Sequence, residues 1–280
     1  MSRRRFWFIK WVEGKTMDQK PPLLETPPAP PPPPATSLVA RLLNIFATPG
    51  EVFEEVKRSA PAVSNWLAPT LLMGIVGAIA AFIILSQPAM IQQIHEQQQK
   101  AMDQQVKAGK MTQEQADKAL DTVEKFSNPA VMKIFGAIGA MVSSFVGLFG
   151  WAFVLWLIGK FLIKAPVQFL KMAEVAGLAS VIVILEIIVK MLLVVSFSNP
   201  LASPSLAMLM KDPDPHNKLF MVLSWLDVMT IWALAIRALG LAKLTGVRFG
   251  RAAWWVFGTW FLLMSFWLGV GSALQAVFAK

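Results

Sequence analysis

Three ionisable residues that fall within long apolar stretches are the first candidates for chemistry in this sequence. Glu186 and Lys190 are four residues apart, so they share one face of a helix. Asp227 lies inside a later apolar run that begins at Leu219. A charged side chain at the centre of a membrane helix costs about 2.5–3.5 kcal/mol on insertion scales, so it needs a partner or water. We therefore expect an intramembrane polar cluster in which Lys190 is shared by Glu186 and Asp227.

This cluster could serve transport or structure. Two carboxylates facing one amine leave a formal negative charge, so one acid could stay protonated or water could enter, and the cluster could then pass protons or cations. Alternatively, the cluster is a buried polar network that fixes the register of neighbouring helices. An aspartyl-type catalytic pair is not expected, because the lysine between the two acids would bind them.

No other pattern in the sequence suggests catalysis or a cofactor. The chain has no HExxH, GxSxG or P-loop motif. His95 and His216 lie far apart, and the chain has no cysteine, so neither a metal-ligand cluster nor a disulfide is expected. We predict no enzymatic activity, no cofactor and no metal site.

The elements that must position the cluster are membrane-spanning helices. The chain is 55% hydrophobic and only 15% charged, with a mean hydropathy of +0.54, which is unusual for a soluble domain. Its net charge of +9 is concentrated at the ends of apolar runs, which indicates membrane topology rather than nucleic-acid binding. Five spans are expected, at about residues 66–86, 131–159, 172–197, 219–241 and 253–276.

The predicted fold is an all-α polytopic membrane bundle with two additional elements. Residues 88–127 are polar and divided by Gly109, and Thr112 with Gln115 forms a capping-box pattern, so we expect an extramembrane helical hairpin there. Ahead of the first span, Thr48, Pro49 and Glu51 form another capping-box pattern, which predicts an amphipathic helix at the membrane surface. This helix could dock a partner or simply pack beneath the bundle.

Residues 1–36 form a basic and proline-rich arm that we expect to be disordered, with an unbroken proline run from Pro30 to Pro34. Met17 is an alternative start to Met1. The ordered membrane domain is then expected over residues 37–280.

Small residues recur at four-residue steps along the second span, in two sets. Such residues let helix backbones approach closely, which favours packing within the chain and leaves homo-oligomerisation as an alternative. The sets are Gly136, Ala140 and Ser144, and Gly139, Ser143 and Gly147.

The basic residues predict the orientation of the chain. Short segments rich in Lys and Arg at the N-terminus, at 160–171 and at 243–251 would share one side, which the positive-inside rule assigns to the cytoplasm. With five spans, the C-terminus is then outside. The fourth span would run inward as one helix, with Ser224, Asp227 and Thr230 as a loose polar strip and Asp227 about as deep as Lys190.

Three stretches of the sequence carry a family resemblance: LLNIFATPGEVFEEVKRSAPAVSNWLAPTLL before the first span, GKMTQEQADKAL in the hairpin, and LDVMTIWALAIRALGLAKLTGVRFGRA in the fourth span. They resemble bacterial members of the Yip family, membrane proteins named for eukaryotic relatives that interact with Ypt/Rab GTPases. The resemblance covers about residues 38–276. It implies a five-span helical domain with a cytoplasmic N-terminus and no enzymatic activity. The chain has SNWLAP where the eukaryotic relatives have a DLxGP-like motif, so Rab binding is not expected.

The preferred interpretation is a non-catalytic membrane organiser or protein-interaction scaffold in the bacterial inner membrane. Its partners would be the lipid bilayer and unidentified membrane or cytoplasmic proteins. The alternative is a small permease or channel component that uses the Glu186, Lys190 and Asp227 cluster, although no inverted repeat is evident. A water-filled path to Asp227 would favour the permease, and a sealed cluster would favour the scaffold.

Overall fold

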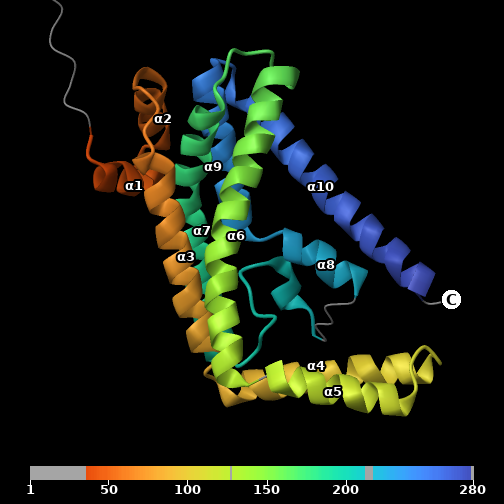
Figure 1. Cartoon of the computed structure of the whole chain (residues 1–280). Coiled ribbons are helices and arrows are strands. Elements are labelled where there is room, and N and C mark those ends of the chain that lie inside the picture. The colour runs from red at the N-terminus through yellow and green to blue at the C-terminus, as the bar shows by residue number, and fades with distance from the viewer. Residues whose placement is uncertain (1–35, 127, 212–216, 279–280) are drawn as a thin grey trace, which may run out of the picture. The chain divides into compact units, whose positions relative to one another are not determined.

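The computed structural model describes residues 36–126, 128–211 and 217–278 (Figure 1). The arm predicted over residues 1–36, with Met1 and Met17, lies outside these residues except for Thr36. The α-helices are α1 (Leu38–Ala47), α2 (Pro49–Arg58), α3 (Ser64–Ile84), α4 (Pro88–Lys107), α5 (Gln113–Phe126), α6 (Pro129–Leu157), α7 (Phe169–Phe197), α8 (Lys218–Trp225), α9 (Val228–Thr245) and α10 (Phe249–Phe278). A π-helical turn, η1 (Ile158–Leu162), extends α6, and a short 3₁₀ helix, η2 (Leu206–Leu209), precedes α8.

The prediction of an all-α fold with five apolar helices is confirmed. Helices α3, α6 with η1, α7, α9 and α10 are long and apolar enough to cross a membrane. The described residues contain no strand, only one isolated bridge between Ser205 and Asp227. The amphipathic helix before the first span and the extramembrane hairpin are also present.

Helix α7 is the centre of the bundle. Every residue from Met172 to Ser180 is buried, because α3, α6 and α9 all pack against this helix. Gly177 allows the closest approach, since a Cβ there would overlap the backbone of Trp66 in α3. Gly240 plays the same part in α9, where a Cβ would overlap Val175. Small residues at these crossings let three helices share one core.

The ends of the spans separate into two groups (Figure 1). One end carries α2, the connection between η1 and α7, and the turn at Gly246 between α9 and α10. The opposite end carries the hairpin of α4 and α5. We call these the basic end and the hairpin end, because the basic 160–171 and 243–251 segments both lie at the first.

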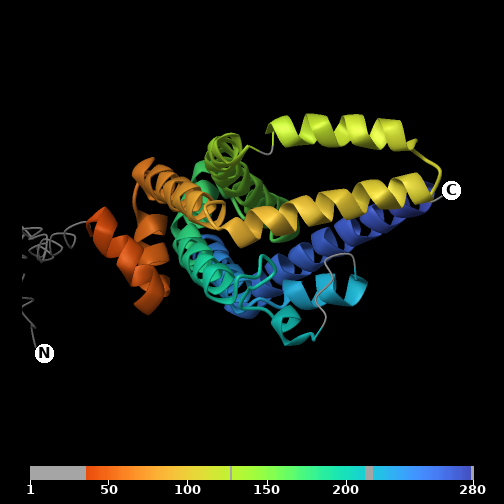
Figure 2. The ribbon, with the colours of Figure 1, turned by 90° about the horizontal axis from the view of Figure 1, so that it is seen from below.

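The hairpin forms where its turn and capping signals predicted it. Gly109 adopts a positive φ of 66° between α4 and α5. Thr112 and Gln115 form a complete capping box: the Gln115 backbone N–H donates to Thr112 Oγ1 at 3.2 Å, and the Thr112 N–H donates to Gln115 Oε1 at 3.0 Å. The two helices run side by side (Figure 2).

The prediction of one continuous fourth span over 219–241 is wrong. The chain forms the short helix α8, breaks at Leu226 and Asp227, and starts again as α9. Helix α8 lies across the direction of α6 and α7 (Figure 1). Bonds to the preceding loop satisfy the backbone at the break: Leu206 N–H donates to Leu226 O at 3.3 Å, and Val228 N–H donates to Pro204 O at 3.2 Å.

The predicted capping box at Thr48 and Glu51 is also wrong, although α2 begins there with Pro49 at its first position. Thr48 makes no side-chain capping bond. It also ends α1, because its N–H donates to Asn44 O at 2.7 Å, and this role sets its backbone at φ −134° and ψ 55°. The Glu51 N–H therefore donates to the backbone carbonyl of Thr48, at 3.0 Å.

Candidate functional site: two polar clusters in the helical bundle

The structure brings together the three ionisable residues singled out from the sequence. Lys190 Nζ donates to Glu186 Oε1 at 2.6 Å within α7, and it lies 3.6 Å from Asp227 Oδ2 at the start of α9. Asp227 is 2% exposed, whereas the Lys190 side chain is 41% exposed. Asp227 is therefore covered, the Glu186 side chain is 13% exposed, and the lysine reaches the surface. We call these residues the Lys190 cluster.

Asp227 holds a different position from the one expected. It is the N-cap of α9, and its Oδ1 accepts the N–H groups of Met229 at 2.9 Å and Thr230 at 3.3 Å. The predicted helical strip of Ser224, Asp227 and Thr230 does not exist, because Ser224 lies in α8. An aspartate stabilises a helix at its N-cap and competes with it from the interior. That preference is a signal that could have located the break.

A fourth charge, Arg237, was not predicted from the sequence. Arg237 lies in α9 and is 7% exposed. Its guanidinium lies 4.4 Å from the centroid of the Trp151 ring in α6, and it experiences the charge of Glu186. Two bases, Lys190 and Arg237, therefore accompany two acids, Glu186 and Asp227. The formal excess of negative charge inferred from the sequence disappears.

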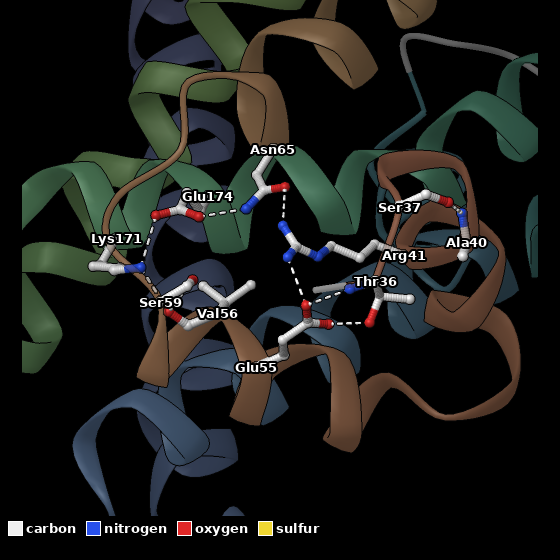
Figure 3. Close-up of polar contacts among 10 residues, drawn as sticks. All are labelled: Thr36, Ser37, Ala40, Arg41, Glu55, Val56, Ser59, Asn65, Lys171 and Glu174. Atoms are coloured by element: carbon white, nitrogen blue, oxygen red, sulfur yellow. Dashed lines mark hydrogen bonds and ion pairs between the residues drawn. The ribbon is translucent and has the colours of Figure 1, made fainter. Parts of the chain in front are cut away.

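A second polar cluster, also missed, joins α1 and α2 to the bundle (Figure 3). Arg41 donates to Glu55 Oε1 at 2.6 Å through Nη2, and to Asn65 Oδ1 at 3.0 Å through Nη1. Asn65 in turn donates to Glu174 Oε2 in α7. Asn65 and Glu174 are completely buried. We call Arg41, Glu55, Asn65, Glu174 and Lys171 the Arg41 network.

Lys171 closes this network at the basic end. Its Nζ lies 3.1 Å from Glu174 Oε1 and donates to Val56 O of α2 at 2.6 Å. The buried carboxylate of Glu174 thus faces the amide of Asn65 from α3 and the ammonium of Lys171 from α7. A second ion pair, from Lys243 Nζ to Glu54 Oε1 at 3.2 Å, ties α2 to α9. Buried charges are tolerated when they are paired and hydrogen-bonded in this way.

The acidic residues of α2 respond to these partners. Burial raises the pKa of Glu55, but hydrogen bonds from Arg41 and Thr36 outweigh it, so the pKa lies below its ordinary value of 4.5. The hydrogen bond from Lys243 likewise lowers the pKa of Glu54. Both carboxylates are therefore favoured in the charged form that binds the bases.

Helix α1 presents two different faces. Arg41 and Ile45 are buried against the bundle, whereas Val39 and Leu43 are 66% and 63% exposed. Phe46 lies beside these two and is also exposed, with its ring in edge contact with Trp232. Because Arg41 binds Asn65, the second residue of α3, this exposed apolar face lies at the level where the first span begins.

The first small-residue set in α6 lies in a helix contact. Gly136, Ala140 and Ser144 approach α3: a Cβ built at Gly77 would lie 3.1 Å from the Cβ of Ala140. In the second set, Gly139 and Gly147 have no atom within 4 Å of a built Cβ, and Ser143 is exposed. Only the first set therefore packs within the chain, and the second lies along an open face of α6.

Among the described residues, no group of three or more metal-ligating side chains could hold a metal ion. The contacts described above are those of ion pairs and helix caps, not of a nucleophile and its base.

The family model described as Yip1 domain matches residues 43–270, which covers α2 to α10 almost completely. No curated protein and no solved structure matches the chain.

Proposed function

Since the chain belongs to the Yip1 domain family, whose members are generally non-enzymatic membrane proteins, we propose that it is a non-catalytic organiser of the membrane in which it is embedded. Its working element is α1, acting as an interfacial helix held rigidly to the spans. Its bacterial setting and inner-membrane location, which follow from the sequence resemblance, are part of the same proposal.

The observation that carries this proposal is the exposed apolar face of α1 at the level where α3 begins. Val39 and Leu43 are exposed there, and Phe46 lies at the edge of this face, in contact with Trp232. The 21 residues of α3 match the length that crosses a hydrocarbon core, so their first turn marks a membrane boundary. An apolar face at that boundary is suited to insertion among headgroups.

The Arg41 network explains how such insertion could act on the bundle. An interfacial helix joined to the spans only by a flexible linker would move with the lipid and would not resist its deformation. Arg41 instead links α1 to α2 and α3, and Glu174 links α3 to the buried centre of α7. Deformation of the leaflet is then resisted by the packed core of the protein.

Reconstitution into liposomes of uniform size tests the proposal. Wild-type protein should reduce vesicle diameter or form tubules as its density increases, as observed by electron microscopy. Leu43→Glu should abolish the effect, because it places a charge in the inserted face. Asn44→Glu adds the same charge beside that face and should retain most of the effect. Unchanged vesicles with the wild-type protein, or equal activity of the Leu43→Glu variant, would refute the proposal.

We also propose that the basic end faces the cytoplasm and the C-terminus faces the outside, as the positive-inside rule predicts. Single cysteines can test this directly, since the native chain has none. With Lys164→Cys at the basic end and Lys110→Cys in the hairpin turn, a membrane-impermeant maleimide added outside intact cells should label only the second. Labelling of the first alone would reverse the orientation.

One observation favours the alternative function, a small permease or channel component. The break between α8 and α9 places Asp227 at a helix N-terminus inside an apolar region, and interrupted helices often form transport sites. Against it, both acids already face a base, since Glu186 Oε1 and Asp227 Oδ2 lie 2.6 and 3.6 Å from Lys190 Nζ. Purified protein should therefore not conduct protons or cations in liposomes; a flux that Asp227→Asn abolishes would establish the permease instead.

A further inference from the structure

A cavity of about 270 Å³ lies between α3, α6, α7 and α9. Its walls are mostly apolar, with Met73, Leu148, Val183 and Ile187 among them. Arg237 also lines it. The cavity is slightly smaller than the ~300–1,000 Å³ of typical small-molecule sites, so it has room for a small anionic group and part of a chain.

The guanidinium of Arg237 is the group in this cavity that lacks a hydrogen-bond acceptor or counter-ion among the described residues. Arg237 is 7% exposed, and its Nε is completely covered without a hydrogen bond. Within the described residues it forms no ion pair shorter than 4 Å. The Trp151 ring, at 4.4 Å, supplies only a cation–π contact. A buried charge in this state is strongly unfavourable unless an anion or water binds it.

Neighbouring polar groups do not meet that need. Glu186 is the acid whose charge acts on Arg237, but its carboxylate is bound to Lys190 Nζ at 2.6 Å. The three serines in the wall, Ser143, Ser144 and Ser180, donate their hydroxyl protons to backbone carbonyls of their own helices. The guanidinium is therefore the hydrogen-bond donor that an anion entering this cavity would find.

The position of the cavity indicates where such an anion comes from. Ser143 and Gly147 line one wall and are exposed on the outer face of α6, so the cavity opens sideways toward lipid. Trp66, near the start of α3, contacts Phe149, two residues before Trp151, so the arginine lies near the level at which α3 begins. Met73 and Gly77 are seven and eleven residues beyond Trp66, about 10 and 16 Å deeper by helix rise.

We infer that this cavity binds a single-chain amphiphile with a carboxylate headgroup, such as a long-chain fatty acid. The carboxylate pairs with the fork of the Arg237 guanidinium, and the chain runs along the apolar walls toward the bilayer centre. A diacyl lipid is disfavoured by the size of the cavity. This inference is independent of the proposed role of α1.

Equilibrium binding of radiolabelled oleate to the detergent-purified chain tests the inference. Oleate should bind saturably at one site. Oleyl alcohol, with the same chain and no charge, and acetate, with the charge and no chain, should compete poorly. Arg237→Gln should weaken oleate binding roughly tenfold or more, as expected for loss of a charge-assisted hydrogen-bonded pair. Lys160→Met removes a positive charge outside the cavity and should leave binding unchanged.

A second variant keeps the test valid if Arg237→Gln fails to fold. Gly147→Leu adds its side chain into open space at the mouth of the cavity, so it should fold normally and still block entry of the chain. Oleate binding that is equal in wild type and Gly147→Leu would overturn the inference, because it would reflect partition into detergent. Competition by acetate as strong as by oleate, or a co-purifying phospholipid that oleate cannot displace, would overturn it as well.

Discussion

Replacing Arg41 with methionine should weaken the attachment of α1 and α2 to the bundle without unfolding the spans. The variant keeps an apolar stem of similar length but removes the bonds to Glu55 at 2.6 Å and Asn65 at 3.0 Å. It also leaves the amide oxygen of the completely buried Asn65 without its donor.

The magnitude follows from the burial of the pair. Breaking a fully buried ion pair costs about 3–5 kcal/mol, and breaking an exposed one about 0–1 kcal/mol. Here the side chains are 10% and 28% exposed, and Glu55 keeps two hydrogen bonds from Thr36. An intermediate cost of about 2–3 kcal/mol is expected, which increases local opening roughly 30- to 150-fold.

Hydrogen–deuterium exchange in nanodiscs measures this opening. Peptides from α1 and α2 should exchange faster by about that factor, whereas peptides from the centre of α7 should be unchanged. Lys118→Met is the matched control, because it breaks the solvent-exposed Lys118–Glu114 pair, whose side chains are 74% and 78% exposed. Exchange of α1 and α2 at the wild-type rate in Arg41→Met would refute the assignment of the network as their anchor.

Three further predictions concern packing, capping and pH. Gly177→Ala should lower the free energy of unfolding of the detergent-solubilised chain by about 1–3 kcal/mol, because the added Cβ would overlap the Trp66 backbone. Gly150→Ala is the control: its Cβ would have no atom within 4 Å, so the free energy of unfolding should be unchanged or slightly higher. Asp227→Asn keeps the N-cap but removes the charge that faces Lys190 at 3.6 Å, whereas Asp227→Ala removes both and should cost about 1 kcal/mol more; equal losses in the two variants would contradict the capping role. Because the folded-state pKa of Glu55 is lowered, its contribution is complete above its unfolded-state pKa and is lost as pH falls through the folded value. Protection of α1 and α2, after correction for the intrinsic pH dependence of amide exchange, should therefore fall as the pH is lowered below the ordinary value of 4.5, and less so in Glu55→Gln.

The sequence predicted the parts of this fold that depend on long apolar runs and strong turn signals. The five spans and the hairpin turn at Gly109 are of this kind. The break before Asp227 was not predicted, because the hydropathy of residues 219–241 continues across it. Its backbone bonds come from the loop around Pro204 and Leu206, which no local pattern reveals.

The candidate site also has a part that the sequence predicts and a part that it does not. Glu186 and Lys190 are one helical turn apart, so their spacing alone predicted that they pair. Asp227 was predicted to join them because it lies at a similar depth in the membrane. The Arg41 network joins residues far apart in the sequence, such as Asn65 and Glu174 at a separation of 109 positions, and it depends on how α1 folds back on α3 and α7. Thr48 shows the same limit on a smaller scale, because its role in ending α1 overrides the capping motif that it begins.

The insertion of α1 into the membrane boundary is the central claim, and fluorescence quenching in liposomes tests it most directly. A polarity-sensitive fluorophore is attached to Leu43→Cys on the exposed face of α1, and to Glu51→Cys on the exposed surface of α2 as the control. The label at position 43 should be quenched by lipid-borne nitroxide near the headgroups and protected from aqueous iodide, and the label at position 51 should behave in the opposite way. Iodide quenching at position 43 as strong as at position 51 would contradict the account.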